Sequence, residues 1–268
     1  MSEVTELIQP GPAVALAALL DVPMPADELP LFWHWVYLLD RPAQADLGRD
    51  GHPVRGSIPA PPAPGRRRMW AGGRAEALAP LRFGEPATRR TSIVSTQEKH
   101  GRSGHLIFVT VGHQILQGGR LAVDERQDLV YREMTGAPSE AAPDAITVPP
   151  TEGEWSVDVT PTLLFRFSAL TYNGHRIHYD RDYAREVEGY PGLLTHGPLQ
   201  ALTMAEAARA RGVTGAGTTC AYRLVAPLFD FQGLVVRVTR GDGEIRAVVR
   251  DLSGLKTAEA TIMAGAAG

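Results

Sequence analysis

The 268-residue sequence predicts an α+β fold built from two similar units. In each half, apolar residues first recur at helical spacing and then fall into several short segments rich in β-branched residues, as in a helix followed by antiparallel strands. Residues 136–154 are rich in proline and acidic residues and are unsuited to a helix or a strand. We therefore expect an N-terminal domain over 1–140, a linker over 141–154 and a C-terminal domain over 155–268.

The first half is expected to contain one helix and three strands. Apolar residues at helical spacing predict the helix over 29–39. A proline-rich surface loop is expected at 56–65. The strands are rich in Val, Ile, Thr and Phe, are separated by glycine turns, and are predicted at 91–99, 105–116 and 121–132.

The second half is expected to begin with two short helices. Thr160 followed by Pro161 is typical of a helix start, and Asp180 is expected to cap a second helix that ends near Val187. A longer helix is predicted at 196–211. Four strands follow, at 218–225, 234–240, 244–250 and 258–263.

Alanine is frequent along the longest predicted helix, at Ala201, Ala205, Ala207, Ala208 and Ala210. Small side chains let a curved sheet approach a helix closely, although a surface helix also tolerates them. Two such units side by side would form a double hot-dog fold, in which each sheet wraps around a long helix.

Composition narrows the class of protein. Hydrophobic residues make up 44% of the chain, enough for buried cores, and the single cysteine, Cys220, excludes an internal disulfide. The acidic start of the chain is unlike a targeting signal, and the apolar run 13–20 is too short to cross a bilayer. A formal net charge of -3 gives no overall attraction to nucleic acid. We expect a cytoplasmic protein with neither a membrane nor a nucleic acid as partner.

Chemically active side chains gather in the segment Tyr172-Asn-Gly-His-Arg-Ile-His-Tyr-Asp180, which has few apolar residues to bury. The pair His196-Gly197 opens the long helix soon afterwards. An imidazole can accept or donate a proton near neutral pH, and a helix start offers free N–H groups and a positive dipole end. This pairing favours acid/base chemistry beside a developing oxyanion.

The segment from Arg166 to Ala184, followed by Gly192-Leu-Leu-Thr-His-Gly-Pro198, resembles the hydratase motif of MaoC-like proteins. More narrowly, it resembles the type 2 hydroxyacyl-thioester dehydratases and the mesaconyl-C4-CoA (3-methylfumaryl-CoA) and itaconyl-CoA hydratases. Leu31-Phe-Trp-His-Trp35 and the residues 98–109 extend a weaker resemblance over the first half. The resemblance implies one active site per chain, with the first domain shaping an acyl channel.

The resemblance also implies roles for individual residues. It places the catalytic base at His178 and the donor to the thioester oxygen at the amide of Gly197. The position of the usual catalytic Asp holds Asn173, whose amide cannot take up a proton and is expected to orient water. Further substrate-binding candidates lie in or beside the motif: Tyr172, His175, Arg176, Asp180, His196 and Arg166.

Plainer interpretations stand beside these roles. Asn173 could cap the preceding helix, and Asp180 is expected to act as an N-cap rather than as a proton carrier. The arginines at 166, 176 and 181 could bind a distal carboxylate or lie on the surface. A metal could be held by His175, His178, Asp180 and His196, but the resemblance implies neither metal nor cofactor, and we expect none.

We therefore expect a hydro-lyase that reversibly adds water across the C2=C3 bond of an acyl-CoA, with a short branched dicarboxylic acyl group. One alternative is a fatty-acid-type 3-hydroxyacyl-thioester dehydratase, with the substrate on acyl carrier protein. A thioesterase fits the His-centred motif less well, and a non-catalytic acyl-CoA-binding protein would explain Asn173 as lost activity. A homodimer is the expected assembly, because hot-dog sheets often pair through their edges.

Overall fold

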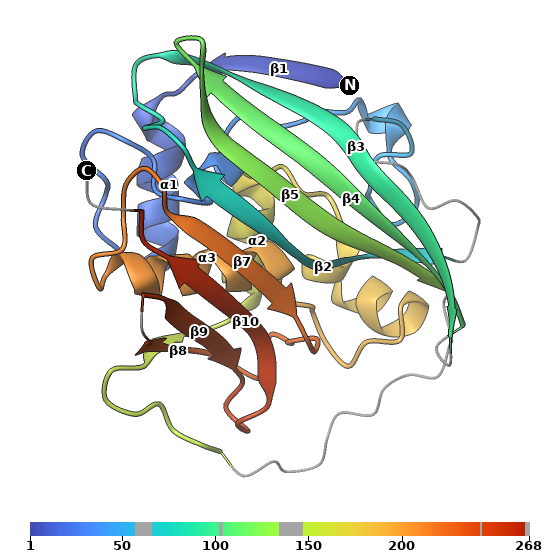
Figure 1. Ribbon diagram of the computed structural model, residues 1–268. Helices are drawn as coiled ribbons and strands as arrows, with labels where there is room; N and C mark the ends of the chain where they lie inside the picture. Colours follow the sequence, from blue (N-terminus) through green and yellow to red (C-terminus); the bar gives the residue numbers. More distant parts are fainter. Residues whose placement is uncertain (57–65, 102–103, 134–146, 242, 266–268) are drawn as a thin grey trace.

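A continuous antiparallel sheet curves around the helices of the protein (Figure 1). The computed structural model describes residues 1–56, 66–101, 104–133, 147–241 and 243–265. Within these ranges ten strands pair in the order β1-β3-β4-β5-β2-β7-β10-β9-β8-β6. The strands of the first half and those of the second half thus form one sheet.

The first half contains one α-helix, two 3-10 helices and five strands within its described residues. These are β1 (Ser2–Leu7), α1 (Pro10–Leu20), η1 (Trp33–Val36), η2 (Gln44–Asp46), β2 (Arg66–Ala77), β3 (Pro86–Gly101), β4 (Gly104–Gln117) and β5 (Arg120–Glu133). The three predicted strands are confirmed as β3, β4 and β5, while β1 and β2 were not predicted. Of the loop expected at 56–65, residues 57–65 lie outside the described residues.

The helix predicted at 29–39 is wrong. That segment forms only the short η1, and Phe32 and Leu38 adopt the left-handed conformation with φ of 72° and 53°. The indole of Trp33 donates to Glu206 Oε1 at 2.6 Å, and the indole of Trp35 donates to Glu125 Oε1 at 2.8 Å. The apolar spacing therefore reflects aromatic side chains, because two of them bind carboxylates that lie on different elements far away in the sequence.

The second half agrees more closely with the sequence-based expectations. Its elements are β6 (Trp155–Val157), α2 (Pro161–Leu170), η3 (Arg176–His178), η4 (Tyr183–Val187), α3 (Gly197–Arg209), β7 (Thr219–Leu224), β8 (Leu234–Arg240), β9 (Ile245–Arg250) and β10 (Lys256–Met263). Thr160 caps α2 by accepting from Leu163 N at 3.1 Å. Asp180 accepts from Tyr183 N at 3.0 Å, so both predicted caps are confirmed.

The long helix α3 lies on the concave side of the sheet (Figure 1). Every residue from Leu199 to Ala208 is buried, and α3 packs against β2 and against the strands β7 to β10. Because an embraced helix has no exposed stripe, its alanines keep the surrounding backbone close. The burial of α3 confirms the close embrace that its alanines suggested.

Strands β2 and β7 join the two halves. Gly72 and Gly73 pair with Arg223 and Tyr222 across this junction. A Cβ atom on Gly72 would lie 2.5 Å from Tyr222 O, and one on Gly73 would overlap the backbone of Arg126. Trp70 adds a hydrogen bond from its indole to the Tyr222 hydroxyl at 2.9 Å. The predicted domain boundary stays a prediction, since the sheet is continuous across the junction and residues 134–146 lie outside the described chain.

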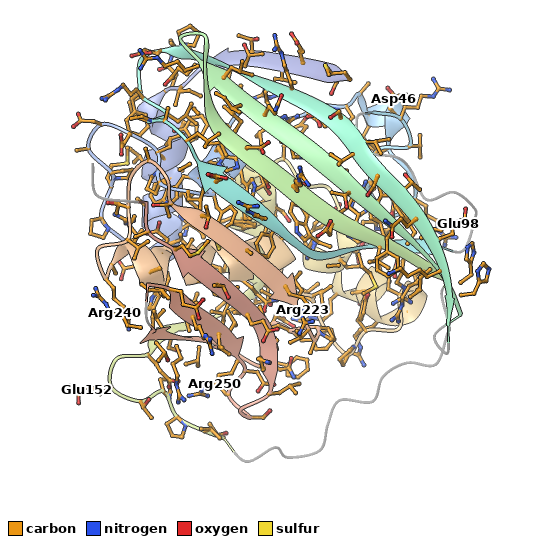
Figure 2. All side chains as sticks on the ribbon, in the orientation of Figure 1. Asp46, Glu98, Glu152, Arg223, Arg240 and Arg250 are labelled. Carbon is orange, nitrogen blue, oxygen red and sulfur yellow. The ribbon has the colours of Figure 1, made fainter. Side chains whose placement is uncertain are left out.

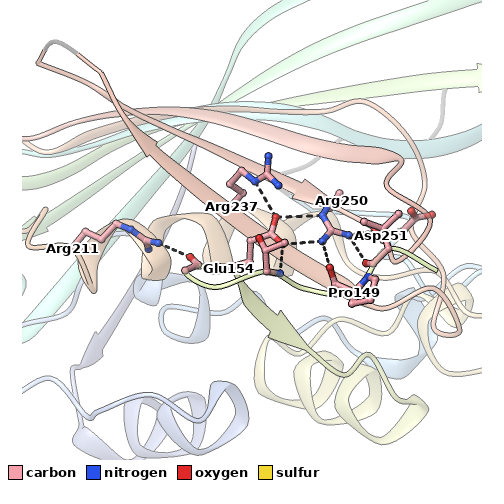
Figure 3. Close-up of polar contacts among 9 residues, drawn as sticks. Pro149, Glu154, Arg211, Arg237, Arg250 and Asp251 are labelled. Carbon is pink, nitrogen blue, oxygen red and sulfur yellow. Dashed lines mark hydrogen bonds and ion pairs between the residues drawn. The ribbon is translucent and has the colours of Figure 1, made fainter. Parts of the chain in front are cut away.

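The end of the predicted linker, residues 147–154, is fixed to the second half of the sheet (Figure 3). The guanidinium of Arg250 donates to Glu154 Oε2 at 2.8 Å and to the carbonyl oxygens of Val148 and Pro149 at 3.0 and 3.2 Å. Arg237 donates to the other oxygen of Glu154 at 2.9 Å. The hydrogen bond from Arg250 is the main reason that the pKa of Glu154 falls to about 2.

Charged side chains cover the outer face and the rim of the molecule (Figure 2). Arg223 of β7 stands on the outer face and donates to Glu259 of β10 at 2.6 Å. Asp46, Glu98 and Glu152 lie at the edge (Figure 2). Among the described helices, none combines the length and the apolar composition needed to cross a membrane.

Replacing the arginine that fixes residues 147–154 should destabilise the protein. We expect Arg250→Gln to lower the free energy of unfolding at pH 7 by about 2 kcal/mol, because the buried guanidinium of Arg250 would lose its hydrogen bonds to Glu154 and to two backbone carbonyl oxygens. Chemical denaturation measures this difference. The exposed pair gives the control, since Arg223→Gln should cost less than about 1 kcal/mol.

The loss of stability in Arg250→Gln should depend on pH. The pKa of Glu154 is depressed in the folded protein, so its contribution to stability is complete above the unfolded value near 4.5 and is lost as the pH falls toward 2. The stability difference between wild type and Arg250→Gln should therefore shrink over that range. A difference that stayed constant from pH 7 to pH 3 would contradict this account.

Candidate active site

A cavity of about 1610 Å³ opens between the two halves. The polar motif after α2 and the first turn of α3 line it from the second half. From the first half it is lined by β2, by the loop 47–56 and by residues of β3, β4 and β5. Its polar groups therefore come from segments that are far apart in the sequence.

His178 is held in the tautomer that a general base would need. Its Nδ1 lies 2.6 Å from the carbonyl oxygen of Leu194. A carbonyl oxygen only accepts, so Nδ1 carries the proton and Nε2 is left with its lone pair. Burial lowers the pKa of His178 to about 4, against the opposing effect of the Leu194 hydrogen bond. The imidazole is thus neutral and able to accept a proton throughout the neutral pH range.

His196 packs against this base. The two rings stack with centroids 3.7 Å apart and planes 18° from parallel. His196 Nε2 lies 2.9 Å from Ser168 Oγ, which ties the start of α3 to the helix α2. His196 Nδ1 and the hydroxyl of Thr195 are buried without a hydrogen-bond partner, and both residues line the cavity. These polar atoms are available to water or substrate.

Four histidines form a continuous row along the cavity. Ring centroids are 3.9 Å apart for His52 and His175, 5.4 Å for His175 and His178, and 3.7 Å for His178 and His196. Burial lowers the pKa of every ring in the row. The row is therefore neutral near pH 7, and a proton taken up by one ring disfavours a second on its neighbours.

The first half contributes His52 through a tightly interlocked loop. A Cβ on Gly51, whose φ is 86°, would overlap the backbone of Gly174. Arg176 N donates to Asp50 O at 2.9 Å across the same contact. Asp50 accepts from His52 Nδ1 at 2.9 Å, which orients that ring against His175. A Cβ on Gly174 would in turn lie 2.9 Å from Gly51 O, so both glycines are needed for the close approach of the two halves.

Gly197 is the first residue of α3, and its N–H therefore lies outside the hydrogen bonds of the helix. It lines the cavity, and a Cβ at this position would overlap the side chain of Leu224. A thioester oxygen beside it would meet both this N–H and the positive end of the helix dipole. Within the described residues, a neutral imidazole with a free Nε2 lone pair and the N–H at a helix start thus line one cavity.

Comparison with known proteins assigns the family. Residues 32–230 match the model of the family described as hydroxyacyl-thioester dehydratase type 2. The chain belongs to this family. Its relative in Chloroflexus aurantiacus, a mesaconyl-C(4)-CoA hydratase, is 49% identical over 227 residues, which cover 81% of this chain and 79% of that protein. The protein is accordingly a hydro-lyase that acts on acyl thioesters, and the alternative classes of function are not favoured.

Solved structures support the fold. The crystal structure of HtdX from Mycobacterium tuberculosis superimposes with a TM-score of 0.70 at 17% identity, covering 97% of this chain and 99% of that one. A second M. tuberculosis protein, described as having a double hot-dog fold, gives a TM-score of 0.57 at 15% identity and covers 97% and 93% of the two chains. The predicted double hot-dog fold is confirmed.

In this hydro-lyase, Asn173 also shapes the motif. Its Oδ1 accepts from His175 N at 3.0 Å, which closes a turn just ahead of His178. The left-handed residue is the preceding Tyr172, with φ of 52° and an exposed side chain. Asn173 and Tyr172 both line the cavity. A turn-forming role for Asn173 therefore has a geometric basis, while its action on water stays a prediction.

The arginines expected to bind a carboxylate differ in position. Arg176 lines the cavity, but it donates to Asp180 at 2.7 Å and lies over the ring of Tyr183. Arg181 pairs with Asp230. Arg166 is exposed on α2 and borders a different, shallow depression. The structure thus brings Arg176 to the site and does not bring Arg166 there.

A second buried polar cluster, which the sequence did not suggest, lies in the first half. Glu125 accepts from Trp35 and Gln127 and lies 2.8 Å from His34 Nε2. Burial would raise the pKa of Glu125, but the bond to His34 and the charges nearby lower it to about 2. His34 and Glu125 also line the cavity. They give the cavity a polar wall on the side of the first half.

One cluster has the composition of a metal site. Asp50, His52 and His175 offer ligand atoms that lie within 4.8 Å of one another. The carboxylate is already engaged with His52, and the positive charge of Arg68 acts on both histidines, which opposes the binding of a second cation. The set also differs from the four residues considered from the sequence. We assign no metal to the site.

The assignment of the base predicts a specific loss of activity. His178→Gln should lower kcat for hydration of an enoyl-CoA by about 10²- to 10⁴-fold, because general base catalysis contributes that much. The loss of absorbance of the conjugated thioester measures the rate, and thermal unfolding tests the fold. His100→Gln, at an exposed histidine, serves as the control. Unchanged kcat in a folded His178→Gln protein would refute the assignment.

The pH profile is a separate prediction. Because burial lowers the pKa of His178 to about 4, the base form is present above that pH and is lost as the pH falls through it. We expect kcat/KM of the wild type to be level from about pH 6 to 8 and to fall only toward pH 4. An acidic limb centred near 6.5 would show that the base is not a buried imidazole.

Proposed function

We propose that the protein hydrates a short, branched dicarboxylic enoyl-CoA, with mesaconyl-C4-CoA as the preferred substrate and itaconyl-CoA as the runner-up. The observation that carries the reaction is the position of His178 and Gly197 on one cavity, with Nε2 of the histidine left as an acceptor. The 49% identity to a mesaconyl-C(4)-CoA hydratase supports the acyl group.

The first step is the attack of water on C3. Nε2 of His178 removes a proton from the water as its oxygen bonds to C3, and the C2=C3 electrons shift toward the thioester. The oxygen of the thioester becomes an enolate oxyanion. The Gly197 N–H and the start of α3 stabilise it, a contribution of about 3 kcal/mol to the barrier for a donor of this kind.

The second step completes the addition. The His178 imidazolium returns its proton to C2, which restores the thioester carbonyl and the neutral imidazole. A single titrating group therefore serves both steps, as the Asn at position 173 requires. The low pKa of His178 makes its imidazolium a strong acid, which favours this proton transfer. The same steps in reverse give the dehydration.

Three finer features belong to the proposal. Arg49 and Arg55 are exposed along the cavity, and their positive charges suit the phosphates of CoA. The acyl group is therefore carried on CoA rather than on an acyl carrier protein. The enzyme works in the cytoplasm, where its one cysteine, the buried Cys220, stays reduced. Two chains pair as a homodimer.

Substrate profiling tests the proposal. We expect kcat/KM to be highest for mesaconyl-C4-CoA, lower for itaconyl-CoA and lowest for the unbranched crotonyl-CoA, as measured by chromatographic separation of the hydrated CoA esters from the substrates. A preference for crotonyl-CoA or for long linear enoyl-CoA esters would refute the dicarboxylic substrate. Tight binding of every ester without turnover would refute the hydratase itself.

A further inference from the structure

We propose that Arg68 of β2 forms a carboxylate-binding subsite beside the histidine row, and that this subsite holds the carboxylate carried by C3 of the substrate. The inference rests on the proposed function. In a C4 thioester of methylfumarate, the free carboxylate is attached to the carbon that receives the hydroxyl group. Its binding group must therefore lie next to the catalytic base.

Arg68 has the required position. It lies on β2 opposite Tyr131 of β5, and it lines the cavity together with His52, His175 and His178. Its positive charge is close enough to lower the pKa of His52 and of His175, in addition to the larger effect of burial on both. The cation therefore lies against the first-half end of the histidine row, next to the motif that carries His178.

The positive charge of Arg68 is also available to bind an anion. Opposite it on the neighbouring strand lies Tyr131, whose phenol is neutral near pH 7 because burial raises its pKa. The neighbouring Asp50 carboxylate is engaged by its own hydrogen bond to His52. Burial disfavours the charged form of Arg68, so an anion that enters the cavity is stabilised by a poorly hydrated cation.

Three other arginines of the described residues, Arg67, Arg89 and Arg176, are already committed to acidic or backbone partners. Arg67 pairs with Glu188 at 3.3 Å and donates to its carbonyl oxygen, and Arg89 donates to Asp40 at 2.7 Å. Arg176 is bound to Asp180 through two nitrogens. Among these described arginines, Arg68 is the one that lines the cavity beside the histidine row with a neutral side chain opposite it on the neighbouring strand.

This position explains why a first-half residue would set specificity. The motif after α2 supplies the base and the oxyanion donor, which any enoyl thioester needs. The planar guanidinium of Arg68 can donate two parallel hydrogen bonds to a carboxylate, whereas a simple alkyl chain offers it no acceptor. Binding the carboxylate at Arg68 would place C3 near Nε2 of His178 and would reject substrates that leave the guanidinium unpaired.

The test compares two substrates in one set of variants. In Arg68→Gln, kcat/KM for mesaconyl-C4-CoA should fall about 100-fold, as expected for a buried charge pair that loses one partner, while crotonyl-CoA should change by less than about 3-fold. Arg68→Lys keeps the charge without the fork and should lose about 10-fold on mesaconyl-C4-CoA. Activity on crotonyl-CoA also shows that the variants fold.

Arg89→Gln is the matched control, because it removes another arginine that lines the cavity. Its ratio of mesaconyl-C4-CoA to crotonyl-CoA activity should equal that of the wild type. Contacts with the CoA moiety cancel in this ratio. An unchanged ratio in Arg68→Gln would overturn the subsite, even if both activities fell together.

A change in the substrate tests the same contact without relying on the fold of a variant. The wild type should hydrate the methyl ester of mesaconyl-C4-CoA about 100-fold more slowly than the free acid, because the ester has no charge to pair with Arg68. Equal rates would overturn the subsite alone. A wild type that hydrates crotonyl-CoA but not mesaconyl-C4-CoA would overturn the proposed substrate, and the subsite with it.

Discussion

The pairing of β2 with β7 is the constraint on which the rest of the molecule depends. Each half by itself would leave one long strand with unpaired N–H and C=O groups at an edge, and the junction satisfies both edges at once. Gly72 and Gly73 allow the strands to approach, since a side chain on either would overlap the neighbouring backbone. The junction also fixes where Arg68, four residues earlier on β2, stands relative to the motif of the second half.

Burial is the second organising factor, and it acts on the acid/base groups. In water the four histidines of the row would each be partly protonated near pH 6.5. In the cavity they are neutral, because a charge on one ring is poorly solvated and repels a charge on the next. The bond to Leu194 then decides which nitrogen of His178 keeps its lone pair. The protein thus gains a defined tautomer and a proton acceptor without any carboxylate at position 173.

Local patterns in the sequence were sufficient for the parts of the site that depend on local structure. Thr160-Pro161, Asp180 and His196-Gly197 mark helix starts, and the spacing of His178 within its motif was visible together with them. The helix at 29–39 was mispredicted because its aromatic spacing is imposed by Glu125 and Glu206, which lie more than 80 residues away.

The contribution of the first half to the site depends on long-range contacts. His52 and Arg68 reach the cavity only through the interlocked glycines of two loops and the register of β2, and neither is encoded in the residues around them. The role of Arg68 could not be recognised from the sequence, because a sequence does not show which side of a strand faces a cavity.

Both units belong to one chain, and Arg250 fixes residues 147–154 to the second unit. This arrangement affects how the enzyme behaves on dilution. The second unit docks on the first at an effective concentration set by the connecting segment, so an active site shared between them does not fall apart when the protein is scarce. The covalent link also removes the requirement of self-complementarity. In a symmetric dimer every substitution occurs twice, whereas here the two units can carry different substitutions, so that the proposed base and the proposed carboxylate-binding arginine can lie on different units.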